Sequence, residues 1–245
     1  MACPPPSQLT SFELLGFGDC GWGATLLWGL GNSLLIAAGA YALGFLIGIG
    51  GAFGKLYGGP ILRDVAAIYT TLVRAVPELV LILILYYAVP GLLNEVMVAL
   101  GQERIILPQF ITGVVVLAFV QGAYQTEVLR GAILAVPHGQ IEAARAMGMS
   151  PLLVARRIIL PLMTSNAVPG LGNLWLNATK DTALLAVIGF SELTKATYQA
   201  SATTKAFFTF YPAAMLMYLL VSMVSIYLFS RLEKWARRGQ RDVRG

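Results

Sequence analysis

Four ionisable residues lie inside apolar stretches of this 245-residue sequence: Arg74, Glu78, Lys180 and Asp181. A charged side chain inside hydrocarbon costs about 2.5–3.5 kcal/mol on insertion scales, so such groups face protein or a polar cavity. A buried cation can hold a ligand carboxylate through charge-assisted hydrogen bonds, and Glu78 or Asp181 can meet a cationic ligand group. The four residues therefore suit the binding of a small zwitterion. The alternative is that they pair with protein groups and lock helices together.

Uncharged polar side chains accompany these charges along the chain. Gln121 and Tyr124 share one apolar stretch, and two asparagines precede Lys180 on another. Arg74 and Glu78 are four residues apart, so on one helix they would share a face. The candidates for substrate binding are therefore Arg74, Glu78, Gln121, Tyr124, Asn173, Asn177, Lys180 and Asp181.

Other reactive residue types form no recognisable catalytic or metal-binding set. The only histidine, His138, lies in a polar loop and is given no role. The two cysteines, Cys3 and Cys20, define no metal or redox motif, and the sequence leaves open whether they form a disulfide. No catalytic residues and no metal site are expected.

A glycine-rich run at residues 50–55 resembles a phosphate-binding loop but lacks two residues that this motif requires. Ile49 stands where that motif needs its first glycine, and Leu56 stands where Ser or Thr must hold magnesium. The run also ends an apolar stretch and does not link a strand to a helix. We predict that the chain is not an enzyme and carries no cofactor of its own.

The composition indicates that a membrane positions these residues. The sequence is 57% hydrophobic and 12% charged, against about 25% charged residues in soluble domains. Helices long enough to cross a bilayer are predicted at 23–53, 65–89, 108–129, 162–190 and 207–229. The fourth is expected to break at Pro169-Gly170, near the middle of the membrane. These lengths exclude a merely apolar soluble domain.

The distribution of positive charge orients the predicted helices. With the N-terminus outside, 12 of the 17 Lys and Arg residues fall in inner loops or in the C-terminal tail, as the positive-inside rule requires. The tail is expected to anchor to lipid headgroups. Glu127 and Arg130 lie near the inner end of their helix and are expected to pair. Gly44 and Gly48 predict close helix contact, either within this chain or with a partner subunit.

The longest inner loop, residues 130–161, has a predictable local structure. A short helix is expected at 140–147, and Gly148 suits the positive φ that often ends a helix. Ser150 then reads as the N-cap of a new helix, with Pro151 at its first position. The loop is thus predicted to be a helix, a sharp bend and a second helix.

Through this loop the chain resembles permease subunits of bacterial ATP-binding-cassette (ABC) importers. The matching residues are Glu142-Ala143-Ala144, Gly148, Ile158 and Leu160-Pro161. Further runs resemble the polar amino acid uptake permeases, and are most similar to the histidine/lysine/arginine/ornithine and opine permeases. These runs are Tyr69-Thr70-Thr71-Leu72-Val73-Arg74, Pro77-Glu78, Gly122-Ala123-Tyr124, Lys180-Asp181-Thr182-Ala183-Leu184 and Glu192-Leu193-Thr194. One departure is Ala75, where the family usually has glycine.

The resemblance implies an all-α integral membrane protein with five transmembrane helices. This is the MetI-like ABC importer permease fold, with two short cytoplasmic coupling helices. It implies a periplasmic N-terminal tail at 1–21, a transmembrane permease domain at 22–230 with its coupling loop at 130–161, and a basic cytoplasmic tail at 231–245. The expected location is the bacterial inner membrane. The residues expected to couple to an ATPase are Glu142, Ala143, Ala144, Arg145, Gly148, Ser150 and Pro151.

The resemblance also implies partners and a ligand. An ATPase dimer would bind ATP and magnesium, and a periplasmic binding protein would deliver a polar, cationic amino acid or an opine. A second permease subunit would complete the pathway, with a heterodimer favoured over a homodimer, and the partner could hold the ligand site. Membrane lipids are expected contacts and nucleic acid is not. The alternatives are another ligand such as glutamine or cystine, an ion-coupled secondary transporter, or a membrane scaffold.

Overall fold

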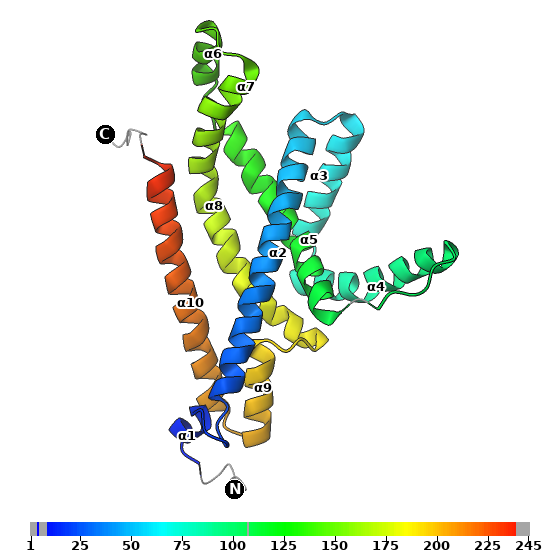
Figure 1. Cartoon of the computed structure of the whole chain (residues 1–245), viewed down its shortest axis with the longest axis vertical. Helices are drawn as coiled ribbons and strands as arrows, with labels where there is room; N and C mark the ends of the chain where they lie inside the picture. Colours follow the sequence, from blue (N-terminus) through cyan, green and yellow to red (C-terminus); the bar gives the residue numbers. More distant parts are fainter. Residues whose placement is uncertain (1–3, 5–8, 107, 239–245) are drawn as a thin grey trace.

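The computed structural model describes residues 4, 9–106 and 108–238, and every regular element within those ranges is helical (Figure 1). The elements are α1 (Ser11–Leu15), α2 (Gly23–Tyr57), α3 (Pro60–Ala75), α4 (Glu78–Ala99), α5 (Gln109–Leu134), α6 (His138–Ala146), α7 (Pro151–Val154), the π-helical turn η2 (Ala155–Ile159), α8 (Leu160–Asp181), the 3₁₀ segment η3 (Thr182–Ile188), α9 (Leu193–Thr204) and α10 (Phe207–Ala236). The all-α prediction is confirmed for this part of the chain.

Helices α2, α4, α5 and α10 are long and apolar enough to cross a membrane, so there are four candidate spans among the described residues. Three of them match the predicted first, third and fifth spans. The predicted second span, 65–89, is wrong as a single helix. Val76 is extended (φ −91°, ψ 139°), and Pro77 separates α3 from α4. Proline lacks the N–H that would continue α3 and disfavours a helical residue before it.

The predicted fourth span also differs from the structure. α8 runs through Pro169 without ending, so the break expected at Pro169-Gly170 is wrong. The change occurs at Thr182 instead, where the α-helix tightens into η3, and Gly189 ends that segment at φ 91°. Helices of membrane proteins tolerate an internal proline where neighbouring helices satisfy the freed backbone groups. Since α8 is not among the four candidate spans, the count of five stays a prediction.

Glycines let α2 approach α5 closely in the core. A Cβ added at Gly48 would lie 2.8 Å from Gln125 Cβ, and one at Gly44 would lie 3.1 Å from Gln121 Cβ. Gly50, on another face of α2, has open space around it. The small residues at 44 and 48 therefore serve packing within this chain, which is one of the two predicted alternatives.

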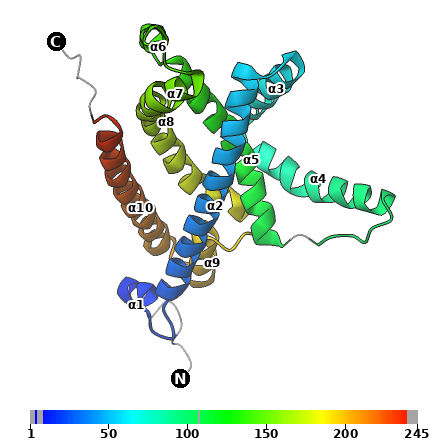
Figure 2. The same cartoon turned by 45° about the horizontal axis from the view of Figure 1, so that its top comes forward.

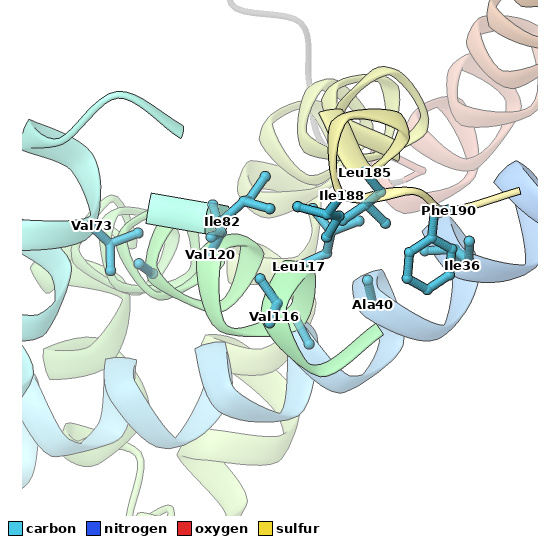
Figure 3. Close-up of a cluster of buried hydrophobic side chains, with 12 residues drawn as sticks. Ile36, Ala40, Val73, Ile82, Val116, Leu117, Val120, Leu185, Ile188 and Phe190 are labelled. Atoms are coloured by element: carbon cyan, nitrogen blue, oxygen red, sulfur yellow. The ribbon is translucent and has the colours of Figure 1, made fainter. Parts of the chain in front are cut away.

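A buried apolar cluster joins α5 to α2, α3, α4, η3 and the segment after η3. Figure 3 shows Val116, Leu117 and Val120 of α5 below Leu185 and Ile188 of η3. The remaining labelled members come from α2, α3, α4 and the segment after η3: Ile36, Ala40, Val73, Ile82 and Phe190. Through Ile82 the cluster holds the first turns of α4. The rest of α4 extends away from the other helices (Figures 1 and 2).

The two ends of the chain are more helical than predicted. The N-terminal tail contains α1, capped by Thr10 and Glu13, and Leu14 packs beside Phe210 in a second apolar cluster. α10 continues to Ala236, so the basic tail begins as helix. The possible Cys3–Cys20 disulfide and the last basic residues, Arg241 and Arg244, depend on positions outside the described residues. The domain boundaries at 1–21, 22–230 and 231–245 stay predictions.

Candidate functional site

A polar cluster forms where the first turn of α4, the middle of α5 and the end of α8 meet. The Gln121 amide nitrogen donates a hydrogen bond of 2.9 Å to Asp181 Oδ2. Gln121 is 1% exposed, and its Oε1 has no hydrogen-bond partner among the described residues. A buried amide oxygen left unpaired costs about 1–3 kcal/mol, so this atom is an acceptor that a donor group would satisfy.

Glu78 reaches this cluster because the chain breaks at Pro77. It lies in the first turn of α4, where the helix dipole favours a carboxylate. Its half-buried side chain interacts with both the Tyr124 hydroxyl and the Asp181 carboxyl group. The Glu78 and Asp181 carboxyl groups thus meet beside Gln121, and two neighbouring acids favour a cationic ligand group.

The two predicted cations lie at the edge of the cluster. Arg74 interacts electrostatically with Tyr124, and Lys180 with Asp181. Both are exposed, and among the described residues neither forms an ion pair with an acid. The prediction that Arg74 and Glu78 share one helix face is wrong, because they belong to α3 and α4. The alternative interpretation, in which the charges pair within the protein, finds no support in an ion pair of Arg74 with Glu78 among the described residues.

Two of the eight candidates are not drawn into the cluster. Asn173 and Asn177 are exposed on α8 and make no hydrogen bond with the cluster in the described part of the chain. Asn173 instead lines a groove of about 190 Å³ beside Ser225 and Phe229 of α10. The structure therefore brings together Arg74, Glu78, Gln121, Tyr124, Lys180 and Asp181.

An ion-pair network lies further along α5, toward the α6–α7 loop. The Glu127 carboxylate accepts from Arg130 at 2.9 Å, as predicted, and also pairs with Lys55 of α2. Lys55 donates in addition to Thr70 Oγ1 of α3 at 2.7 Å. The role of Lys55 was not foreseen, because its partners are 15 and 72 residues away in the sequence.

A second buried network, also not foreseen, surrounds Glu192. This side chain is fully buried and caps α9 by accepting from Lys195 N at 2.8 Å. Its other oxygen accepts from Ser33 Oγ at 3.2 Å and from the Tyr218 hydroxyl at 3.1 Å. The network ties α2, α9 and α10 together. Glutamate is not among the residues that usually cap a helix, so sequence reasoning had no capping signal to find at Glu192.

The loop at 130–161 adopts the predicted helix, bend and second helix. α6 begins at His138, two residues earlier than expected, and Gly148 has φ 78°. The Ser150 hydroxyl accepts from Leu153 N at 3.4 Å, and Pro151 begins α7. In Figures 1 and 2 this loop lies at the opposite end of the molecule from α1 and α9.

The surface of this loop suits contact with another protein. Glu142, Ala143 and Arg145 are exposed, while Ala144 faces inward. Two large apolar side chains beside the bend are also exposed, Met147 at 81% and Leu152 at 79%. The π-helical turn η2, which joins α7 to α8, was not predicted. Within the described ranges, no group of three or more His, Cys, Asp or Glu residues could hold a metal ion.

Comparison with known proteins finds transport-system membrane components that match most of the chain. Residues 40–241 match the family described as "Binding-protein-dependent transport system inner membrane component". The nopaline transport system permease protein NocQ of Agrobacterium fabrum is 43% identical over 94% of this chain and 98% of its own length. The histidine/lysine/arginine/ornithine transport system permease protein HisQ of Escherichia coli is 39% identical over 84% of this chain and 90% of its own length.

Solved structures with the same arrangement of helices are also known. A chain of an amino acid ABC transporter crystallised with histidines superposes with a TM-score of 0.74 at 30% identity, covering 87% of this chain and 94% of that one. A chain of the inward-facing MetNI methionine ABC transporter superposes with a TM-score of 0.69 at 17% identity, covering 88% and 97%. The second likeness concerns the fold alone.

Proposed function

This chain belongs to the family of inner membrane components of binding-protein-dependent transport systems, and we propose that it translocates a cationic amino acid or an opine as the permease subunit of an ATP-driven importer. The observation that carries the ligand class is the meeting of the Glu78 and Asp181 carboxyl groups beside Gln121, whose buried amide oxygen has no partner among the described residues. The names of its relatives, which include nopaline and histidine/lysine/arginine/ornithine permeases, agree with a ligand that carries a cationic group.

The acceptor cluster explains this preference physically. A guanidinium or ammonium group brings several N–H donors and a positive charge to two carboxyl groups and an amide oxygen. Arg74 and Lys180, exposed at the edge of the cluster, are placed to meet the α-carboxylate of the same ligand. A neutral side chain such as that of glutamine would leave the acids without a counter-charge, so glutamine and cystine are the second choice.

The ATP-hydrolysing activity belongs to a separate subunit in this proposal. Its docking surface is the loop of α6 and α7, through Glu142, Ala143, Ala144, Arg145, Gly148, Ser150 and Pro151. The exposed charges and the exposed Met147 support a protein contact there. ATP and magnesium are held by that partner, and this chain contributes the two short coupling helices.

The proposed topology follows the positive-inside rule. The N-terminus lies in the periplasm, the α6–α7 loop and the C-terminus lie in the cytoplasm, and α8 is the fifth span across the inner membrane. The opposite placement of α1 and the α6–α7 loop supports this orientation. The chain pairs with a second permease subunit, for which a different chain is favoured over a second copy, and it receives ligand from a periplasmic binding protein.

Reconstitution into proteoliposomes tests the proposal. The chain is assembled with its candidate ATPase, second permease and binding protein, and uptake of arginine, histidine, octopine and glutamine is measured with and without ATP. ATP-dependent uptake of the cationic ligands or the opine is expected. Uptake driven by an ion gradient in the absence of the ATPase would overturn the proposal, and ATP-driven uptake of glutamine alone would overturn the ligand class.

A further inference from the structure

An apolar groove lies beside the end of α2, on the side of the α6–α7 loop. It measures about 710 Å³, within the ~300–1,000 Å³ of typical ligand sites. Its apolar lining comes from α2, α5, α7, η2 and α8, and includes Phe53, Tyr57, Ile133, Leu152, Leu160 and Met163. The groove is separate from the polar cluster of Gln121 and Asp181, which contributes no residue to its lining.

One charged residue, Arg156, lies among these apolar side chains. It is exposed and forms no ion pair with an acid of the described residues. Among the residues that the structure describes, no acidic side chain lines the groove to oppose it. An apolar groove with a single unpaired cation complements a molecule that has a long apolar part and an anionic headgroup.

The backbone at Arg156 is also unusual. Ala155, Arg156 and Ile159 line the groove from η2, a five-residue π-helical turn. Such turns are rare and frequently mark functional sites, because the wider turn moves side chains out of the regular helical positions. This turn connects α7 directly to α8, so a molecule in the groove would contact the joint between the loop and the long helix.

We propose that the groove binds an anionic phospholipid of the inner leaflet, with an acyl chain along Phe53, Tyr57 and Met163 and the phosphate at Arg156. This inference rests on the proposed topology, which places the groove at the cytoplasmic surface of the membrane. Basic pockets between membrane helices on that side are typical sites for anionic headgroups. The aromatic pair Phe53–Tyr57, with ring centroids 5.7 Å apart, suits the interfacial depth.

Quenching by brominated lipids tests the proposal with the full-length chain in nanodiscs. Leu152→Trp places a fluorophore in the groove at a side chain that is 79% exposed, and Leu219→Trp places a control on α10 at a side chain that is 50% exposed and does not line the groove. In one series, brominated phosphatidylglycerol is titrated into unlabelled phosphatidylcholine. In the other, brominated phosphatidylcholine is titrated into unlabelled phosphatidylglycerol. The signal of the four native tryptophans, measured in the unaltered chain, is subtracted.

We expect phosphatidylglycerol to quench Leu152→Trp at a lower mole fraction than Leu219→Trp, and phosphatidylcholine to quench both alike. A basic side chain at an anionic lipid surface contributes about fivefold in affinity. Arg156→Gln in the Leu152→Trp background should therefore raise the half-quenching mole fraction about fivefold. Arg157→Gln, the same change at the adjacent residue of η2 that does not line the groove, should leave it unchanged.

Three results would overturn the lipid site. Equal quenching of Leu152→Trp by both lipids means ordinary bilayer contact, and no quenching by either means that lipid does not enter the groove. An equal effect of Arg156→Gln and Arg157→Gln means a diffuse charge effect. The measurement needs neither ATP nor transported ligand, so its outcome is separate from that of the uptake experiment.

Discussion

Lys55 at the end of α2 forms an ion pair with Glu127 on α5, although the two residues are 72 positions apart. Their side chains are 14% and 16% exposed, so the pair is largely withdrawn from solvent. Arg130 adds a second cation, and Thr70 accepts a hydrogen bond from Lys55. The network fixes α2, α3 and α5 to one another at the end of the molecule that carries the α6–α7 loop.

Removing one member of this pair should destabilise the protein. Lys55→Met leaves Glu127 with Arg130 as its only cation, and Glu127→Gln leaves Lys55 without a counter-charge. Loss of one partner of a fully buried pair costs about 3–5 kcal/mol, and partial exposure reduces this to roughly 2–3 kcal/mol. We expect the thermal unfolding midpoint in nanodiscs to fall by about 4–12 °C for each variant.

The double variant and a surface control decide the interpretation. Lys55→Met with Glu127→Gln should lose less than the sum of the single losses, because a coupled pair is not additive. Arg63→Met removes an exposed cation of α3 and should change the midpoint little. Strictly additive losses would argue that the two residues act independently.

The close packing of α2 on α5 gives a second prediction. Gly48→Ala would bring a Cβ to within 2.8 Å of Gln125 Cβ, so the helices must separate. Overpacking of this kind costs about 1–3 kcal/mol. Gly50→Ala, two residues away in the same helix, meets open space and should be neutral or slightly stabilising. Thermal unfolding of the two variants checks this, and equal midpoints would contradict the packing role of Gly48.

Much of the fold follows from sequence features that act locally. The apolar length of α2, α5 and α10 predicts their existence, and Gly148, Ser150 and Pro151 predict the bend of the loop. The two errors in the spans both concern proline. Pro77 ends α3, while Pro169 lies within a continuous α8. Whether a proline ends a helix depends on the neighbouring helices that satisfy the freed carbonyl groups, and the sequence does not record those neighbours.

Less of the candidate site was predictable, because it depends on distant contacts. Gln121 and Asp181 are 60 residues apart, and their hydrogen bond follows from how α5 packs against α8. The expectation that Arg74 and Glu78 share one helix face assumed one continuous helix, and the break at Pro77 removes its basis. The buried carboxylate of Glu192 was missed because its partners Ser33 and Tyr218 come from two other helices.

The bend at Gly148 gives a third prediction. Its φ of 78° is a left-handed conformation, which costs other residues roughly 1–2 kcal/mol. Aspartate tolerates this conformation better than most residues, so the main effect of Gly148→Asp is to add a carboxylate to the proposed ATPase contact. It should lower ATP-driven uptake about tenfold while hydrolysis of ATP persists. Gly139→Asp makes the same change within α6, where nothing lies nearby, and serves as the control. Full uptake by Gly148→Asp, with normal docking of the ATPase, would contradict the coupling role.

The acceptor cluster gives the fourth prediction. Glu78→Gln and Asp181→Asn each remove a charge from the group that includes the Gln121 oxygen, but keep the size of the side chain. A hydrogen bond to a charged group contributes about 1.5–3 kcal/mol, so the KM for arginine or an opine should rise by roughly 10–100-fold. Glu95→Gln removes an exposed charge further along α4 and should leave KM unchanged. A loss that is selective for cationic ligands supports their contact with the cluster, whereas the same loss for glutamine would mean that the acids only support the fold. An unchanged preference in both variants would remove Glu78 and Asp181 from the site and point to the partner permease.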